Sequence, residues 1–364
     1  MPPGDMQGRM TWMNDRVGMK KIALRVSLIG AVILAALCFR MFRSPEPIEL
    51  VFTGATMATS WSAKVIAPSD SAGVANRCRQ AVEKELEQVN RDMSLFHEGG
   101  AVFRLNAAPA GQPVPVPRSV MDLLVQARRI SEQTDGAFDV TVGPLVRLWG
   151  FHSGEAPAVL PEDADIAAVR RKVGYRKLVL SREDGTVTKT VDGLEVDLSA
   201  IAKGRAVDLV ASALNGLGMT NYMVEVGGEV RARGRNRHRE PWRIGIEEPV
   251  DEDVRRLNRI IGLHNRSLAT SGDYRNFYIC NGRRYSHTID PSTGRPVSHE
   301  LASVSVLARD CMTADALATA LSVLGVEKGM PLAERKGWAA YFITRNAEGK
   351  TLARATRRFD DLAR

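Results

Sequence analysis

Two oxygen-bearing side chains, Asp315 and Thr319, stand four residues apart in an alanine-rich stretch towards the C-terminus. A helix would place both on one face, and the small neighbouring residues would let a ligand approach closely. Oxygen ligands of this kind suit Mg²⁺, which also keeps waters or substrate phosphates in its shell. Taken alone, such a pair is more often a solvated acid beside a threonine that bonds to its own helix. The apolar composition favours burial instead, and a buried carboxylate needs a partner.

A second set of polar residues surrounds the expected start of another helix. Asp197 follows an apolar stretch, at a position where its carboxylate can cap the helix or contact a ligand. Lys203, six residues later, can bring a positive charge to a phosphate. In isolation, an N-cap and a surface lysine explain this segment better than a binding site does.

Residues 136–145 combine small residues with one aromatic ring, Phe138, and one acid, Asp139. A Gly-Ala backbone could approach a flat ring there, with Asp139 at the polar edge of that ring. A tight turn before a strand is an equally good interpretation. Neither Asp139 nor Asp197 has an obvious partner in its own segment, so we expect both carboxylates to accept hydrogen bonds from a ligand.

His287 is the most suggestive of the six histidines, because it lies at the end of a predicted strand and before a turn. An acid–base group or a ligand contact is well placed at such a position. A lone histidine is nevertheless more often structural. The turn at residues 270–273 adds hydroxyl and backbone N–H groups that could hold an anion.

The elements that must position these residues mix helices and strands. Apolar residues recur at helical spacing in Ser71–Met93, and Ser119 is the expected cap of a helix that runs to about residue 136. Further helices are predicted at residues 200–217 and 313–324, strands at residues 222–226 and 339–344, and hairpins around Asp184-Gly185 and Asn281-Gly282. Strands next to hairpin turns predict an α+β fold with a largely antiparallel sheet and packed helices.

The overall composition excludes several classes of protein. Apolar residues make up 44% and charged residues 25% of the 364 residues, which is typical of a globular chain and not of a disordered one. The formal net charge is +8, but the basic residues are scattered and are not interleaved with aromatic residues, so nucleic acid is not an expected partner. The four cysteines include no C-x-x-C pair, which argues against a zinc site.

An apolar run at residues 28–39 follows Lys20, Lys21 and Arg25. A positive flank before such a run is the layout of a secretory signal or a signal-anchor. There is no good A-x-A cleavage site, so an uncleaved anchor is the favoured interpretation. We therefore expect residues 1–47 to form a tail, membrane anchor and linker, and residues 48–364 to form one domain. That domain would face the periplasm from the inner membrane.

Taken together and in order, these segments resemble the ApbE family of bacterial flavin transferases. The similarity runs from about Phe52 to Leu324. The segments that carry it are Gly54–Thr59, Met93–Phe96, Ala137–Asp139, Asp197–Gly204, Val226–Glu229, Ala269–Tyr274, Ser286–Gly294 and Ala314–Thr319. Two positions depart from the family pattern: Ala58 stands where glycine is usual, and Phe96 stands where tyrosine is usual. The second departure puts a hydroxyl contact to the flavin nucleotide in doubt.

The resemblance implies an FAD:protein FMN transferase that uses FAD as its substrate and Mg²⁺ as its cofactor. The residues that it implies as FAD contacts are Met57, Phe96, Ala137, Phe138, Asp139, Asp197, Lys203 and Ile289. Those that it implies as Mg²⁺ ligands are Ala200, through its backbone oxygen, Asp315 and Thr319. His287 is the candidate catalytic residue, which would assist proton removal or orient the substrate.

In the implied reaction, a threonine hydroxyl of an acceptor flavoprotein attacks the FMN-side phosphorus of FAD, and AMP leaves. The acceptor would carry a threonine flavinylation motif, as a subunit of a membrane redox complex could. Thr53–Thr56 resembles such a motif, but no acid precedes it at the usual spacing, so self-flavinylation is disfavoured.

Two other functions remain open. One is an Mg²⁺-dependent FAD pyrophosphatase, and the other is a non-catalytic periplasmic flavin-binding protein. Retention of Asp315 and Thr319 argues against the non-catalytic protein, whereas nothing in the sequence separates the transferase from the pyrophosphatase.

Overall fold

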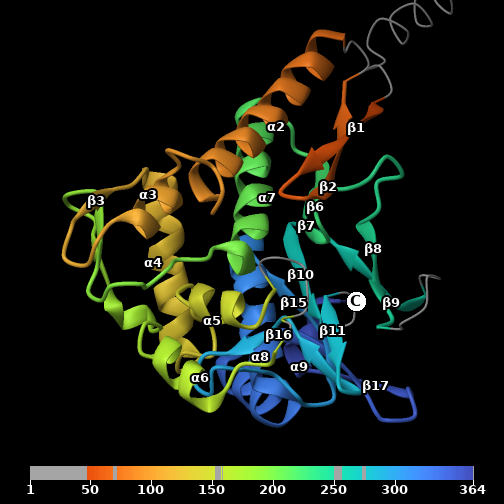
Figure 1. Cartoon of the computed structure of the whole chain (residues 1–364). Helices are drawn as coiled ribbons and strands as arrows, with labels where there is room; N and C mark the ends of the chain where they lie inside the picture. Colours follow the sequence, from red (N-terminus) through yellow and green to blue (C-terminus); the bar gives the residue numbers. More distant parts are fainter. Residues whose placement is uncertain are drawn as a thin grey trace, which may run out of the picture. The chain divides into compact units, whose positions relative to one another are not determined.

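The largest element of the fold is an eight-stranded antiparallel sheet (Figure 1). The structure is a computed structural model, which describes residues 47–68, 72–151, 157, 159–249, 256–272 and 276–363. Its strands, in spatial order, are β1 (Ile48–Thr56), β2 (Thr59–Ala67), β6 (Tyr222–Val226), β7 (Glu229–Arg233), β10 (Arg266–Gly272), β15 (Leu301–Ala308), β16 (Ala339–Arg345) and β17 (Thr351–Ala355). Every pair of neighbours in this sheet is antiparallel. The predicted α+β class with a large antiparallel sheet is therefore confirmed.

The helices are α2 (Ala72–Met93), α3 (Ala101–Ala107), α4 (Arg118–Gln133), α5 (Gly143–Leu148), α6 (Asp163–Arg170), α7 (Ser199–Gly216), α8 (Cys311–Lys336) and α9 (Arg357–Leu362), with a 3₁₀ turn at Tyr175–Lys177. The prediction that Ser119 caps α4 is wrong, because Pro117 occupies the N-cap position. Its φ of −57° suits a helix start. The predicted end of α8 at Leu324 marks a kink, since Gly325 has a φ of 68° and a second helical segment follows it.

Four smaller sheets are built from short strands. In the first, β5 (Thr186–Lys189) lies between β3 (Val114–Pro115) and β4 (Leu178–Ser181). The other three are pairs: β8 (Trp242–Glu247) with β9 (Leu257–Leu263), β11 (Phe277–Cys280) with β12 (Arg283–Ser286), and β13 (Ile289–Asp290) with β14 (Arg295–Pro296). Both predicted hairpins form. In the β11–β12 hairpin, Asn281 and Gly282 have φ values of 51° and 72°, which fit a two-residue turn.

The main sheet separates the two larger of three hydrophobic cores. Alternate residues of β16 face opposite sides: Phe342 packs in the larger core with helices α2, α4, α7 and α8, whereas Tyr341 packs in a second core with β8, β9 and α9. Figure 1 shows α4 and α7 on one side and the β8–β9 hairpin on the other. Helix α8 contacts α7, α4 and the sheet at once, which explains why its sequence is apolar on several faces.

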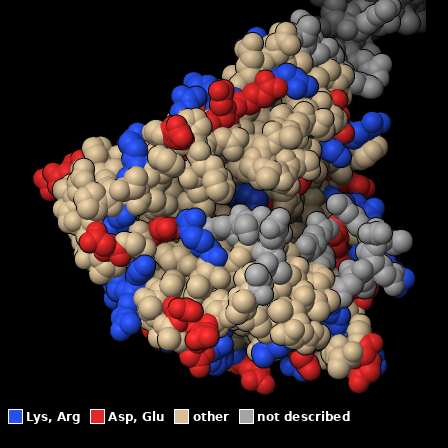
Figure 2. Space-filling view, in the orientation of Figure 1, with Lys and Arg blue, Asp and Glu red and all other residues tan. Residues whose placement is uncertain are grey.

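Within the described part of the chain, no helix is long and apolar enough to cross a membrane. The expected anchor at residues 28–39 lies outside the described residues. On the face that Figure 2 shows, Lys and Arg side chains alternate with Asp and Glu side chains.

Candidate active site

Helices α7 and α8 run in opposite directions, and two sets of hydrogen bonds fix their register. The Asp208 carboxylate accepts from the backbone N–H groups of Cys311 and Met312, each at 2.9 Å, at the start of α8. One turn earlier in α7, the N–H of Gly204 donates to Oδ2 of Asp315 at 2.9 Å. Because the helices are antiparallel, each residue one turn earlier in α7 lies opposite a residue one turn later in α8.

This register extends to the predicted magnesium ligands. One further turn places Ala200 of α7 opposite Thr319 of α8, and both residues are half-buried. In a regular helix the Gly204 N–H would bond to the carbonyl of Ala200. Because that N–H donates to Asp315, the Ala200 carbonyl competes with a carboxylate for its usual donor. By this register the three predicted oxygen ligands would lie within one turn of one another, on the facing sides of α7 and α8.

Gly204 allows the two helices to approach this closely. A Cβ atom at Gly204 would lie 2.5 Å from the carbonyl oxygen of Cys311 and 2.8 Å from Cβ of Asp315. Real Cβ atoms do not come so close to other atoms, so any larger residue must push α8 away from α7.

Lys203 points to a buried acid on the neighbouring sheet. Its Nζ lies 2.8 Å from Oε2 of Glu229, whose side chain is only 2% exposed. Glu229 begins β7 directly after the turn Gly227-Gly228, in which both glycines have positive φ. A Cβ atom at Gly227 would lie 2.8 Å from Thr59 and 3.1 Å from Cδ of Lys203. The β1–β2 turn, the Gly227 loop and Lys203 therefore lie against one another.

The electrostatics of this cluster are set by two acids and one cation. Burial raises the pKa of Glu229 to about 8, the Asp315 charge adds to the rise, and Lys203 opposes it. Burial also raises the pKa of Asp315 above its ordinary value, against the effects of Lys203 and the Gly204 N–H. Burial lowers the pKa of Lys203, but the two carboxylates outweigh it and leave that pKa raised. The cluster of Lys203, Glu229 and Asp315 can therefore carry excess negative charge that a divalent cation would offset.

Asp139 is already held by its own surroundings. Its carboxylate accepts from the backbone N–H of Thr141 at 2.8 Å, from Oγ1 of Thr141 at 2.6 Å and from the backbone N–H of Tyr175 at 2.8 Å. The expectation that Asp139 lacks a partner in its segment is wrong. Burial nevertheless leaves the pKa of Asp139 raised above its ordinary value. Beside it, Ala137 is 9% exposed, while Phe138 is 1% exposed and packs in the larger core.

Asp197 also has a partner in its own segment, contrary to expectation. Its Oδ1 accepts from the backbone N–H of Ser199 at 2.9 Å, in the first turn of α7. Leu198 occupies the N-cap position itself. The backbone N–H of Asp197 donates to the carbonyl of Val140 at 2.7 Å, which joins the segment at residues 137–140 to the start of α7.

Three further predicted FAD contacts lie in different surroundings. Met57 and Ala58 form the two-residue turn between β1 and β2, with φ values of 48° and 55° that favour glycine. Phe96 follows α2 and is 78% exposed. Ile289 is 5% exposed and packs with Trp149 in a third, smaller core.

His287 lies between β12 and β13, beside a stack of aromatic rings. Its Nδ1 is 2.9 Å from the carbonyl oxygen of Asn276, and its ring meets that of Phe151 edge-on at 6.4 Å. A carbonyl can only accept, so Nδ1 carries the hydrogen and Nε2 is the basic nitrogen of the neutral ring. Among the described contacts, none joins His287 directly to Lys203 or Asp315.

Three residues that build this part of the site were not among the candidate site residues of the sequence analysis, although two of them lie in segments that carry the family resemblance. They are Gly204, Asp208 and Glu229. For Glu229 the available signal was an acid directly after a Gly-Gly turn, and for Asp208 an acid in an otherwise apolar part of a helix. Neither signal identifies the distant residue that each acid contacts.

Comparison with known proteins identifies relatives that cover most of the chain. The sequence model of the ApbE family matches residues 57–342. An FAD:protein FMN transferase of Haemophilus influenzae is 38% identical over 326 residues, which span 88% of this chain and 94% of that protein. One of Vibrio cholerae is 42% identical over 307 residues, spanning 84% of this chain and 90% of that protein.

A solved structure agrees with this assignment. The flavin transferase ApbE from Vibrio cholerae has a TM-score of 0.79 and 39% identity to this chain, and the match covers 87% of this chain and 99% of that one. Sequence and fold together show that the chain belongs to the ApbE family.

Proposed function

We propose that this protein is an FAD:protein FMN transferase, the activity for which its relatives are named. The observation that carries the proposal is the cluster of Lys203, Glu229 and Asp315. There, two buried carboxylates interact with the charge of one ammonium group, about one helical turn from the level at which the register would bring Ala200 and Thr319 together. A site of this kind suits a substrate with a charged pyrophosphate and a divalent cation.

The residues present fit Mg²⁺. Asp315 would supply one carboxylate ligand, Thr319 a hydroxyl and Ala200 a backbone carbonyl, and the phosphates of FAD would supply others. Within the described residues, no group of three His, Cys, Asp or Glu side chains could hold a metal ion. That finding fits a cation that depends on substrate oxygens more than a site made of protein side chains alone. When bound, Mg²⁺ would neutralise phosphate charge in the transition state.

The flavin nucleotide would be held by the elements that meet at the start of α7. Lys203 would place its ammonium group near the pyrophosphate, and Met57 would contribute from the adjacent β1–β2 turn. Phe96 is exposed enough to contact a ring. Phe138 and Ile289 have buried side chains, so they would contact FAD through their backbone groups.

Proton transfer would be the role of His287. A threonine Oγ of the acceptor would form a bond to the FMN-side phosphorus, while the bond from that phosphorus to the oxygen of AMP breaks. The hydroxyl proton would pass to Nε2 of His287, which the Nδ1 contact with the Asn276 carbonyl leaves as the basic nitrogen. AMP would leave with its phosphate.

The test is incubation of the protein with FAD, Mg²⁺ and an acceptor flavoprotein that carries a threonine flavinylation motif. We expect the intact mass of the acceptor to rise by the mass of one FMN group, with one AMP released per acceptor modified. Release of AMP and free FMN without a mass change of the acceptor would instead identify a pyrophosphatase. Flavin binding without any AMP would identify a non-catalytic flavin carrier.

The expected location is part of the proposal. The charged flank and apolar run of residues 20–39 support anchoring in the inner membrane, with the catalytic domain in the periplasm. A phosphatase fused after residue 47 should be active only if it is exported. Activity of that fusion confined to the cytoplasm would contradict this location.

A further inference from the structure

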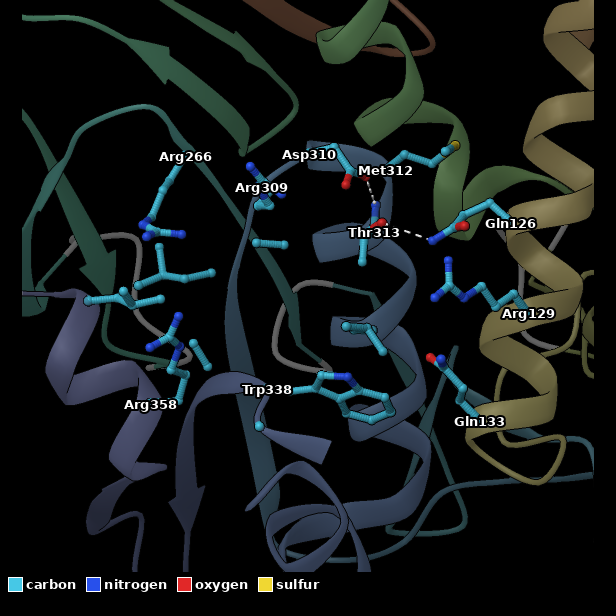
Figure 3. Close-up of a pocket in the computed structure, with 16 residues that line it drawn as sticks. Gln126, Arg129, Gln133, Arg266, Arg309, Asp310, Met312, Thr313, Trp338 and Arg358 are labelled. Carbon is cyan, nitrogen blue, oxygen red and sulfur yellow. Dashed lines mark hydrogen bonds between the residues drawn. The ribbon is translucent and has the colours of Figure 1, made fainter. Parts of the chain in front are cut away.

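A concave pocket of about 460 Å³ lies at the start of α8, beside α4 (Figure 3). Four arginines from four separate elements line it: Arg129 of α4, Arg266 of β10, Arg309 before α8 and Arg358 of α9. Its volume lies within the range of small-molecule sites, about 300–1,000 Å³.

The pocket has a large excess of positive charge. Of the described residues that line it, Asp310 is the only acid, and Oδ1 of Asp310 already accepts from the backbone N–H of Thr313 at 2.8 Å. Among the described residues, none of the four guanidinium groups forms an ion pair or a side-chain hydrogen bond. Arginines elsewhere do find acids: Arg147 lies 2.6 Å from Glu195, and Arg259 lies 2.9 Å from Asp360.

The neutral lining groups favour a ligand that also carries a flat or polar part. Trp338, just after the end of α8, is half-buried and lines the pocket, and Figure 3 shows its indole ring in the view between Arg358 and Gln133. Gln126 and Gln133 lie on the α4 side, and Nε2 of Gln126 donates to Oγ1 of Thr313 at 3.0 Å. Guanidinium groups match phosphate oxygens in geometry, and an indole ring can stack on a base.

We propose that this arginine pocket binds a phosphate group, supplied either by inorganic phosphate or by a mononucleotide whose base contacts Trp338. The site is separate from the flavin cluster. Thr313 faces α4 and the pocket, whereas Asp315, two residues later, faces Gly204 of α7. The proposal does not depend on the transferase activity, because it requires only the charge and shape of this side of α8.

The test is calorimetric titration of the full chain with three probes: inorganic phosphate, AMP and adenosine. For AMP, the protein is first saturated with FAD, so that the flavin site does not contribute. We expect phosphate and AMP to bind, with affinities that fall as salt is added. Tighter binding of AMP than of phosphate identifies a mononucleotide as the source, and equal affinities identify inorganic phosphate. Adenosine alone should bind weakly or not at all.

Two arginine variants and a matched control decide the location. Arg309→Ala and Arg358→Ala should each weaken phosphate binding about tenfold or more, the loss expected for a hydrogen bond to a charged group. Arg243→Ala removes an exposed arginine on β8, outside the pocket, and should leave the affinity unchanged. Trp338→Phe should remove the change in fluorescence that AMP causes.

Two outcomes would overturn the proposal. These are the absence of phosphate and AMP binding to the wild-type protein, and equal losses of affinity in Arg243→Ala and Arg309→Ala. Thermal melting of each variant without ligand shows whether its fold is intact. The two arginine variants should melt like the parent, because both side chains are exposed.

Discussion

The two sides of helix α8 differ in whether their charged side chains have partners within the fold. On the side that faces α7, Asp315 and Glu229 are almost fully buried; Lys203 forms an ion pair with Glu229, and its charge also interacts with that of Asp315. On the side that faces α4, the guanidinium groups of the arginine pocket have no acidic partners among the described residues, and all of these arginines are exposed except Arg266, which is half-buried (Figure 3). On the α7 side, the buried carboxylates need partners within the fold to offset their charge. On the α4 side, water or a ligand can offset the charge of the arginines.

The difference has a physical basis in solvation. A charge removed from water loses its hydration, so a buried acid must find a cation, a hydrogen-bond donor or a proton. An exposed arginine keeps its hydration and can remain without a partner at little cost. We therefore expect substitutions on the α7 side to have large effects on activity and stability. Those on the pocket side should change ligand binding alone.

The largest expected effect is on catalysis. Asp315→Asn keeps an oxygen that can accept from the Gly204 N–H but removes the charge that would hold Mg²⁺. The rate of FMN transfer should fall about a hundredfold or more. Loss of a residue that only hydrogen-bonds to a metal ligand already lowers metal affinity or activity by about 10–100-fold. Initial rates of FMN transfer at saturating FAD and Mg²⁺ measure the size of this decrease. A variant that melts like the parent and keeps full activity would remove Asp315 from the site.

Loss of the shared cation should cost the most stability. Lys203→Met leaves Glu229 facing Asp315 without an ammonium group between them, and breaking a buried pair costs about 3 kcal/mol or more. Urea unfolding gives the free energy of unfolding. The double variant with Glu229→Gln should recover part of the loss, because the remaining acid then faces a neutral amide. No recovery would show that Lys203 stabilises the fold through other contacts.

The close approach of α7 and α8 can be tested at Gly204. Gly204→Ala places a methyl group 2.5 Å from the carbonyl oxygen of Cys311, and overpacking of this kind costs about 1–3 kcal/mol. Gly216→Ala, near the end of the same helix, is the matched control, since nothing lies within 4 Å of its added Cβ. Equal stabilities of the two variants would contradict the tight helix contact.

The stability of the metal-free protein should decrease as pH rises. The pKa of Glu229 is about 8 in the folded protein, against 4.5 for an ordinary glutamate. A group with a raised folded-state pKa contributes stability that is fully present below its unfolded pKa and is lost as pH rises through its folded pKa. Unfolding midpoints measured with EDTA at about pH 6 and about pH 9 should therefore differ. Glu229→Gln should reduce that difference, and an unchanged pH profile would assign it to another group.

The smallest effect is expected on the pocket side. Arg309→Ala removes an exposed positive charge from a group of like charges, so the free energy of unfolding should change by no more than about 0.5 kcal/mol. A slight gain would reflect relief of repulsion. A large loss would mean that Arg309 has a partner inside the fold, and the contrast between the two sides of α8 would then fail.

Several features of the site follow from local sequence. Spacing of four residues placed Asp315 and Thr319 on one helical face, and Asn281-Gly282 formed its turn as predicted, because both features depend on neighbouring residues only. The hairpin turns predicted antiparallel pairing correctly, although both predicted hairpins form small sheets outside the eight-stranded one. The motifs also identified the ApbE family correctly, since their order along the chain needs no knowledge of the fold.

Other features were decided by the tertiary structure. Asp139 accepts from Tyr175, which is 36 residues away, so this hydrogen bond depends on the tertiary fold, whereas the hydrogen bonds from Thr141 are local. Lys203 meets Glu229 only because α7 packs on the sheet, and the arginine pocket exists only because four elements converge there. Local propensity determines which face of an element a side chain occupies. The packing of distant elements determines which partner it meets, and therefore whether a charge is compensated within the fold or left for a ligand.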